Sequence, residues 1–442
     1  MPKINRRNML KLTGGAAVAA KTAGLAGILA TGQSPVIAQT TTVHWLKWND
    51  FVPAGDEILR KQMLAEGEKA LGIKLNLETI GLNDLQARAT AAIQAKSGAD
   101  IIMAFNNNAQ LYAESCADVS DLCEDVAKQQ GGYYDLAKAQ ANDGKRWIAV
   151  PYCIIGAMIA YRKSWFDEAG IGKFPETWEQ YREAGKKLKA KGHPVGQSLG
   201  HTVGDAPAFC YPLLWSFGGR EVEADGKTVK LNSKETVEAV KFMTAFWKEG
   251  HDEGGVAWDD SNNNRAFLSG TISATLNGAS IYIESLRKPD SYKTEAGKQM
   301  KDDILHAPLP KGPAGQFGVH PFQCHMVMGY SKNQKAAKEF LSWFHSPAVY
   351  DKWFKVQKGF ATGPTTSWEK STLWDEDPVM APYRVAGRLG RVYGYAGPAG
   401  QKAAEVLSKY IIVDMFAKAV QGMAAEEAVK WAEGEVKKAY GT

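Results

Sequence analysis

Residues 73–105 decide the fold, and they read IKLNLETIGLNDLQARATAAIQAKSGADIIMAF. Apolar and polar residues alternate from Ile73 to Ile80, which is the period of a half-buried strand. Residues 83–96 follow the period of an amphipathic helix, with Asn83 at the N-cap position. The apolar run 100–105 then predicts a short buried strand. The stretch therefore predicts a strand–helix–strand unit of a parallel sheet.

A second strand–helix pair precedes this stretch. Residues 41–46 have the composition of a strand, and residues 56–71 follow the period of an amphipathic helix. The combined order predicts an α/β fold in which helices cover a parallel sheet. Ligands of such sheets bind beyond the carboxyl ends of the strands. Those ends carry the polar stretches 48–50 and 106–108, whose residues are also ordinary turn formers.

The amino-terminal residues have the pattern of an export signal. Residues 5–11 (NRRNMLK) place twin arginines before the apolar run 12–29, and residues 36–38 (VIA) offer a cleavage site. We therefore predict a twin-arginine signal peptide over residues 1–38 and a periplasmic location. The alternatives are a basic tail or a membrane anchor, but the apolar run is glycine-rich and shorter than the roughly 20 residues of a spanning helix.

Length and charge narrow the class further. Removing 38 of the 442 residues leaves 404, a length that favours two lobes over a single core. The signal holds five lysines and arginines and no acidic residue, so the formal net charge falls from +5 to 0. This loss of net positive charge argues against nucleic acid or an anionic membrane as a partner, and we expect no nucleic acid.

The chain has five cysteines, at positions 116, 123, 153, 210 and 324. An oxidising compartment permits a disulfide, and Cys116 and Cys123 are the plausible pair. The alternative is that all five are buried thiols. An odd number leaves at least one thiol free unless two chains pair.

Beyond residue 150 the sequence is rich in helices. Val150-Pro151-Tyr152 is interpreted as a crossing between lobes, and Thr177 as the N-cap of a helix. Further helices are predicted at 205–217, 233–249 and 260–268, and strands at 271–276, 306–310 and 323–330.

Catalytic and metal-binding signatures are not found. The sequence has no GxxxxGK, GxGxxG, HExxH or GxSxG motif, and its eight histidines form no pair at i, i+4. The adjacent acids Asp259 and Asp260 fit a helix start better than a glycosidase pair. We therefore expect no enzyme activity, no cofactor and no bound metal.

Aromatic residues stand in polar, loop-like surroundings. The chain has 13 Trp, 16 Tyr and 16 Phe. Flat rings stack on the C–H faces of sugars, while Asp, Asn, Gln and Arg match sugar hydroxyls. Both kinds occur together in residues 48–50 and 277–282. Core packing is the alternative role for each of these rings, and composition does not separate the two.

Six short stretches occur in a recognisable order. They are GADII (98–102), AVPY (149–152), YRK followed by FDEAGI (161–171), PETWE (175–179), AFLSG followed by NG (266–278) and KAAKEFL (335–341). Together they resemble the extracellular solute-binding proteins of ABC importers, in the branch that includes the maltose-binding type. The likeness covers residues 40–442, and the order of the motifs carries it rather than any single one.

The resemblance implies the type II periplasmic binding protein fold, with two lobes that are each a mainly parallel sheet flanked by helices. The implied lobes are residues 39–151 with 324–373, and residues 152–323 with 374–442. A ligand would bind in the cleft between them. The implied ligand-binding residues are Trp48, Asn49, Asp50, Asn107, Tyr152, Asp205, Trp215, Asn277, Tyr282, His320, Phe322 and Tyr395.

The implied function is binding without reaction. The protein would capture a sugar or polyol by hinge closure and deliver it, as a monomer, to the permease subunits of an ABC importer. Its neutral charge and its Trp, Tyr, Asn and Asp content favour an uncharged ligand, with polyamines as an alternative. The competing classes are an exported glycosidase or lyase, a cofactor-carrying oxidoreductase, and a sensor subunit of the same fold.

Overall fold

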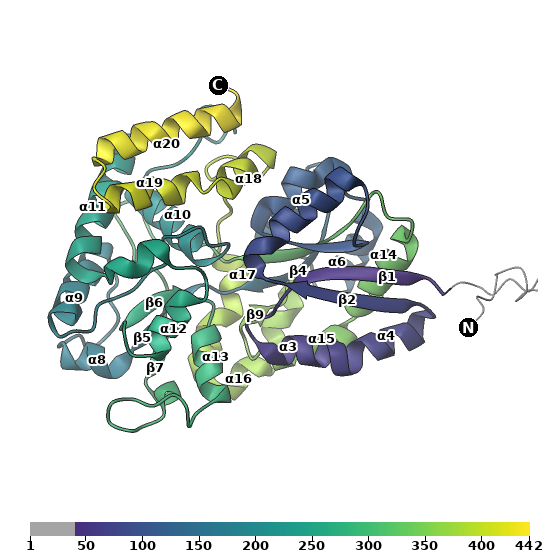
Figure 1. The fold of residues 1–442 in the computed structure, drawn as a ribbon, viewed down its shortest axis with the longest axis horizontal. Helices are drawn as coiled ribbons and strands as arrows, with labels where there is room; N and C mark the ends of the chain where they lie inside the picture. The colour runs from purple at the N-terminus through teal and green to yellow at the C-terminus, as the bar shows by residue number, and fades with distance from the viewer. Residues whose placement is uncertain (1–39) are drawn as a thin grey trace, which may run out of the picture. The chain divides into compact units, whose positions relative to one another are not determined.

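The structure is a computed structural model, and it describes residues 40–442. The predicted signal peptide, residues 1–38, lies outside the described residues. Two sheets organise the described chain (Figure 1). One has six strands in the order β2-β1-β3-β8-β4-β9, and the other has three strands in the order β6-β5-β7. We call each sheet with its helices the first and the second lobe.

Three strands of the six-stranded sheet form the predicted parallel unit. They are β1 (Thr42–Trp48), β2 (Lys74–Ile80) and β3 (Ile101–Phe105). β1 pairs in parallel with both neighbours, and Trp48 at its end lies opposite Ile80. β3 is buried along its whole length, as its continuous apolar run predicts. The carboxyl ends of all three strands therefore point to the same edge of the sheet.

The other half of this sheet is antiparallel. It holds β4 (Val150–Ile155), β8 (Phe322–Val327) and β9 (Ala361–Thr362). β8 pairs antiparallel with β3 on one side and β4 on the other. β4 leads the chain out of the sheet and β8 brings it back, so the two run in opposite directions. The expectation of a mainly parallel sheet is therefore correct for β2-β1-β3 only.

Helices from two separate parts of the chain flank this sheet (Figure 1). They are α3 (Pro53–Ile58), α4 (Leu64–Leu71), α5 (Leu85–Ala95), α6 (Ser120–Gln129), α7 (Asp135–Ala141), α14 (Gln334–Phe344) and α15 (Pro347–Val356). A π-helical turn, Leu59–Met63, joins α3 to α4. The predicted N-cap at Asn83 is wrong. The chain first makes a 3₁₀ turn, Leu82–Asp84, and Asp84 then stands at the N-cap of α5 without a side-chain cap bond.

The second sheet is antiparallel throughout, contrary to the expectation. Its central strand β5 (Met158–Arg162) pairs with β6 (Ala274–Asn277) and with β7 (Ile304–Ala307). β5 follows β4 after only two residues, so it continues the outward course of the chain. β6 and β7 come from later segments and run against it.

The helices of the second lobe come from residues 163–287 and 401–440 (Figure 1). They are α8 (Lys163–Glu168), α9 (Trp178–Ala190), α10 (Asp205–Phe217), α11 (Lys234–Gly250), α12 (Asn262–Leu268), α13 (Ser280–Arg287), α18 (Gln401–Ser408), α19 (Ile411–Val420) and α20 (Ala425–Tyr440). The predicted cap of α9 is confirmed, because Thr177 and Gln180 form a reciprocal capping box. α10 has the predicted bounds.

Three chain segments cross between the lobes, and they are joined to one another. The N–H of Ile155 donates to the carbonyl of Pro321 at 2.8 Å, which joins the first crossing to the second. The N–H of Arg391 donates to the carbonyl of Gly318 at 2.9 Å, which joins the third. The third crossing contains α16 (Leu373–Glu376), the 3₁₀ helix η7 (Pro378–Val385) and α17 (Ala386–Leu389). The other 3₁₀ helices are η3 (Asn106–Ser115), η4 (Glu253–Ala257), η5 (Met300–Asp302) and η6 (Thr366–Lys370).

All five cysteines are free and buried, so the suggested Cys116–Cys123 bridge is not formed. The two thiols face different partners: Cys116 donates to the carbonyl of Tyr112 at 3.2 Å, and Cys123 to that of Ala149 at 3.6 Å. Burial raises the pKa of Cys116 to about 12. Separately, among residues 40–442 no helix has both the length and the hydropathy that a membrane crossing requires.

Candidate ligand-binding site

The segment after β3 joins the two lobes. Asn106 has a left-handed backbone (φ 50°), which asparagine tolerates better than most residues. Its Oδ1 accepts from the N–H of Phe322 at 3.3 Å, and its Nδ2 donates to the carbonyl of Val203 at 3.1 Å. Asn107 Nδ2 donates to the carbonyl of Ala399 at 3.3 Å. Asn107 is fully buried, and its Oδ1 has no partner among the described residues.

Two carboxyl groups lie on the second lobe next to this junction. Asp260 accepts hydrogen bonds from the N–H groups of Val203, Gly204 and Asp205, with the shortest at 2.7 Å to Asp205. Burial raises the pKa of Asp260 and, with the charge of Asp260, raises the pKa of Asp205 well above its usual range. Neither acid forms an ion pair within residues 40–442. Both oxygens of Asp260 are occupied by these N–H groups, whereas Asp205 accepts only through Oδ2 within this part of the chain, so Asp205 has acceptor capacity left for a ligand.

An asparagine network extends from Asp205 to β6. Asn263 Nδ2 donates both to Asp205 Oδ2 at 2.6 Å and to the carbonyl of Leu276 at 3.1 Å. The next residue, Asn264, accepts from Asn277 Nδ2 at 2.6 Å. Asn277 Oδ1 in turn accepts from the N–H of Ile281, at the start of α13. The predicted residues Asp205 and Asn277 thus belong to one connected polar group.

The second lobe also contributes a cluster of aromatic side chains to the candidate site. The ring centroids of Trp215 and Tyr395 lie 5.5 Å apart, and Phe317 packs against both rings. The guanidinium group of Arg391 lies over Tyr395 at 4.4 Å and over Phe317 at 4.8 Å. Trp215 is buried, whereas Tyr395 is partly exposed. Phe317 is partly exposed as well, so Tyr395 and Phe317 are the rings of this group that a ligand can reach.

His320 lies on the second crossing. Its Nδ1 accepts from the N–H of Ala157 at 3.0 Å, which assigns the proton of the neutral ring to Nε2. Burial lowers the pKa of His320 to about 4, so the ring is neutral at pH 7. The Nε2–H group makes no hydrogen bond within residues 40–442 and is a free donor.

The residues predicted at the end of β1 make mostly internal contacts. Trp48 is only 2% exposed and packs edge-on against Phe51 and Phe105. Asp50 accepts from the N–H of Val52 and from Gln357 Nε2 at 2.9 Å. Asn49 is exposed. Of the three, the structure leaves Asn49 free for a ligand.

Three further predicted residues are packed inside the protein. Tyr152 lies in an aromatic cluster, with its ring 4.6 Å from His325 and 4.5 Å from Trp353. Phe322 is fully buried in β8. Tyr282 is 5% exposed, and its hydroxyl donates to Asp377 Oδ2 at 2.7 Å. The structure thus places these three rings in the core.

A cavity of about 40 Å³ lies where the lobes meet. Phe105, Asn108 and Tyr112 line it from the first lobe, and Val203 and Tyr410 from the second. A buried water needs roughly 10–15 Å³ of such space, so the cavity has room for a few waters but not for a sugar ring. A ligand of that size therefore requires the lobes to move apart.

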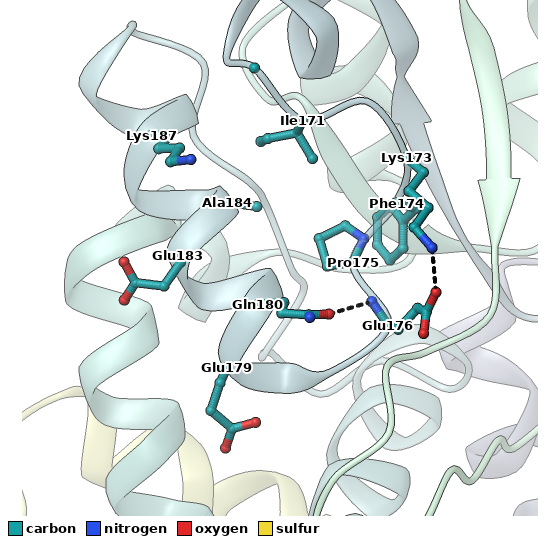
Figure 2. A pocket seen from close by; sticks show the side chains of 11 residues that line it. Ile171, Lys173, Phe174, Pro175, Glu176, Glu179, Gln180, Glu183, Ala184 and Lys187 are labelled. Atoms are coloured by element: carbon teal, nitrogen blue, oxygen red, sulfur yellow. Dashed lines mark hydrogen bonds and ion pairs between the residues drawn. The ribbon is translucent and has the colours of Figure 1, made fainter.

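A second pocket lies on the surface of the second lobe, beside α9 (Figure 2). Ile171, Phe174 and Pro175 line it together with Glu179 and Glu183 of the helix. None of the implied ligand-binding residues lines it. None of them lines the small cavity between the lobes either, so we place the candidate site at the lobe junction from the hydrogen bonds of Asn106 and Asn107 and not from a cavity. Within residues 40–442, no group of three His, Cys, Asp or Glu side chains is arranged to hold a metal ion.

Sequence reasoning did not single out four residues of the candidate site. Asn106, Asn263 and Asn264 lie in NNN runs (106–108 and 262–264) that are the only signal for them. Asp260 was interpreted as a helix-start residue, and its carboxylate does accept from the N–H groups at the start of a helix. That helix, however, is α10, which begins 55 positions earlier in the sequence.

The family model of the bacterial extracellular solute-binding proteins matches residues 53–351, more than half of the chain. The chain belongs to this family. The predicted class, a solute-binding protein rather than an enzyme, is thereby confirmed. The description of the family also confirms the predicted extracellular character of the protein.

Individual relatives of this solute-binding protein are distant. The diacetylchitobiose binding protein DasA of Streptomyces coelicolor is 27% identical over 160 residues, which is 35% of this chain and 35% of that protein. The chain thus spans about a third of this curated relative. The GacH receptor of Streptomyces glaucescens superposes with a TM-score of 0.74 at 21% identity, covering 91% of this chain and 99% of the receptor.

A solute-binding protein of Thermotoga lettingae superposes with a TM-score of 0.76 at 19% identity, over 91% of this chain and all of that one. At these identities the likeness shows the fold alone. It confirms the prediction of a two-lobed binding-protein fold.

Proposed function

We propose that this protein captures a carbohydrate or polyol between its lobes and delivers it to the permease of an ABC importer. The relatives support the ligand class. DasA is a diacetylchitobiose binding protein, the GacH receptor has been seen with acarbose, and the Thermotoga protein with α-D-tagatose. We further propose a periplasmic location after export through the predicted signal peptide, action as a monomer, and the lobe boundaries given by the resemblance.

One observation carries the proposal: polar side chains of both lobes meet where Asn106 bonds to Val203, next to Asp205, and where Asn107 bonds to Ala399, in the segment that carries Tyr395. Asp205 provides an acceptor for hydroxyl groups, and Tyr395 provides a flat face for a C–H surface. Asn277, which is 2% exposed, supports them through its bonds to Asn264 and Ile281. Asn107 and His320 add an unpaired acceptor and a free donor. We propose these five residues, with Trp215 behind Tyr395, as the ligand-binding set.

Hinge closure follows from the geometry. The lobes already touch through Asn106 and Asn107, and the cavity between them is too small for a sugar ring. A ligand must therefore enter an open form and replace some interlobe contacts with its own. Because it contacts both lobes only when they are together, it shifts the population toward a closed form.

A thermal-shift screen tests the function. The panel holds mono- and oligosaccharides, sugar alcohols, amino acids and polyamines, each at millimolar concentration. A bound ligand raises the melting temperature because it binds the folded state alone. Calorimetric titration of each hit then gives its affinity, and chromatography of the recovered ligand shows that it is unchanged. Stabilisation by amino acids or polyamines only, or conversion of a glycan, would contradict the proposal.

A further inference from the structure

Arg391, on the third crossing, carries a guanidinium group that forms no hydrogen bond and no ion pair within residues 40–442. Each of the other arginines in this range makes at least one such contact, as Arg388 does with Glu369 at 2.7 Å. The side chain of Arg391 is exposed, and only its backbone N–H is bonded, to Gly318. Its charge and its five N–H donors are therefore open to a group from outside the chain.

Two aromatic rings restrain this guanidinium group. It lies 4.4 Å from the ring centroid of Tyr395 and 4.8 Å from that of Phe317, and the two centroids are 6.2 Å apart. A cation–π contact fixes the position of a guanidinium group without pairing its charge with an anion. Arg391 is therefore a positioned cation whose counter-charge is still to be supplied.

The guanidinium group belongs to the candidate site. Tyr395, on which it lies, is one of the rings that a ligand can reach. Gly390, next to Arg391, lies against the second crossing, because a Cβ atom added to it would be 3.0 Å from Cδ2 of His320. The Nε2–H group of His320 is the free donor described above. Arg391 and His320 thus offer a charged and a neutral donor on two adjoining crossings.

The second crossing also leads to the carboxyl groups of the site. Pro321 lies beside Gly204, where an added Cβ atom would be 3.8 Å from Cγ of the proline, and Asp205 follows Gly204. Burial raises the pKa of Asp205 and of Asp260, which favours their neutral forms. An anionic group at Arg391 therefore meets weaker repulsion than two fully ionised carboxylates would exert.

We propose that Arg391 selects acidic carbohydrates. It binds a carboxylate or phosphate group of a sugar whose hydroxyl groups and C–H face contact Asp205 and Tyr395. This inference rests on the proposed function, because it names the class of carbohydrate that the same site takes.

An anionic sugar fits this arrangement better than a neutral one. A guanidinium group binds two oxygens of a carboxylate or phosphate through two parallel N–H bonds, which are about twice as strong as bonds between neutral groups. The Nε2–H group of His320 adds a donor nearby. The expectation of an uncharged ligand came from the formal net charge of the whole chain, and that sum does not register one unpaired arginine.

Calorimetry with matched pairs of sugars tests the proposal on the purified protein. The pairs are D-glucuronate with D-glucose, D-galacturonate with D-galactose, and each neutral sugar found by the screen with its uronic acid and its phosphate ester. We expect the acidic member of a pair to bind about tenfold tighter or more. The uronates and the phosphate esters distinguish the two sources of the anionic group. Neutral sugars that bind as tightly as their acids would overturn this inference and leave the proposed function standing, whereas a lack of binding by every sugar would overturn both.

Arg391→Gln identifies the residue responsible, because it removes the charge and keeps a polar side chain. Arg287→Gln is the matched control, since that exposed arginine of α13 pairs with Glu284 at 2.8 Å. The ratio of acid to neutral affinity should fall about tenfold or more in Arg391→Gln and stay unchanged in Arg287→Gln. An unchanged ratio in Arg391→Gln would overturn the proposal. If that variant does not fold, salt decides with the wild type: raising NaCl from about 50 to 500 mM should weaken binding of the acid alone, and an equal effect on the neutral sugar would overturn the proposal.

Discussion

The side-chain amide of Asn106 donates a hydrogen bond to the carbonyl oxygen of Val203, and this 3.1 Å contact ties the end of β3 to the start of α10. The same side chain accepts from the N–H of Phe322 on the strand that returns to the first lobe. One residue in a left-handed conformation therefore joins both lobes and a crossing segment. The contact joins the lobes directly, so it contributes to how readily they separate.

Replacing Asn106 with Asp should favour the open form. The carboxylate keeps the acceptor for Phe322 and tolerates the left-handed backbone, but it cannot donate to Val203 and repels its carbonyl. We expect a larger radius of gyration in X-ray scattering without ligand, and a cost of about 1–3 kcal/mol in the free energy of unfolding. Asn108→Asp is the matched control, because Asn108 bonds only within the first lobe. An unchanged radius in Asn106→Asp would show that the contact does not restrain the lobes.

Replacing Asp205 with Asn should weaken ligand binding with little effect on folding. Asp205 Oδ2 accepts from Asn263, and an amide can keep that bond through its own oxygen while losing acceptor capacity toward a ligand. We expect affinity to fall about fivefold, equivalent to the roughly 1 kcal/mol of one hydrogen bond between neutral groups. Asp259→Asn is the control, because Asp259 accepts only from Ser261 and Asn262. Equal affinities for Asp205→Asn and wild type would remove Asp205 from the site.

The ring of Tyr395, rather than its hydroxyl, should matter for binding. Tyr395→Phe keeps the surface that Trp215 and Arg391 hold in place, so its affinity should stay within about twofold of wild type. Tyr395→Ala removes the ring and should cost about 1–2 kcal/mol of binding free energy. Isothermal titration of both variants checks this. A large loss in the Phe variant would instead assign the contact to the hydroxyl.

Buried histidines should make the protein sensitive to acid. Burial lowers the pKa of His306 and His320 to about 4, and of His251 and His345 to about 3. The unfolded chain binds protons near pH 6.5 while the folded one does not. The contribution of each neutral histidine to the free energy of unfolding is therefore fully present above pH 6.5. It is lost as the pH falls toward 4, by about 1.4 kcal/mol per pH unit for each histidine.

Urea denaturation at pH 7, 6 and 5 measures this slope. His251→Phe is the diagnostic variant, because His251 stacks on Trp247 in the apolar core of the second lobe. The free energy of unfolding of the variant should change less steeply with pH than that of the wild type, by the equivalent of one bound proton. A slope equal to that of wild type would mean that His251 is not held neutral.

Local patterns in the sequence predicted local structure well. The alternation in residues 73–80 and the apolar run 100–105 gave β2 and β3, and Thr177 caps α9 as predicted. Such local patterns could not predict the pairing of β3 with β8, because it joins residues more than 200 positions apart. The direction in which two strands pair depends on which way the chain crosses between the lobes. The apolar periodicity of a strand does not indicate that direction.

The sequence points to residues of the candidate site only where polar residues end a strand or begin a helix. Asn277 and Asp205 lie at such points, and the structure joins them through Asn263 and Asn264. Tyr152 shows why the aromatic residues were harder. β4 is buried on both faces, so its ring packs against Trp353 and not against a cleft. A buried strand and a ligand-lining strand have the same composition, and only the fold separates them.

The linkage of the three crossing segments restricts how the protein can flex. Ile155 is bonded to Pro321, and Gly318 to Arg391, so every covalent route between the lobes passes through one narrow bundle of backbone. A rigid rotation about that bundle changes few torsion angles there, yet displaces distant parts such as α9 through a long lever arm. Spectroscopic labels on α4 and α9 would consequently register solute capture as a large change in separation, even though the bundle itself hardly alters.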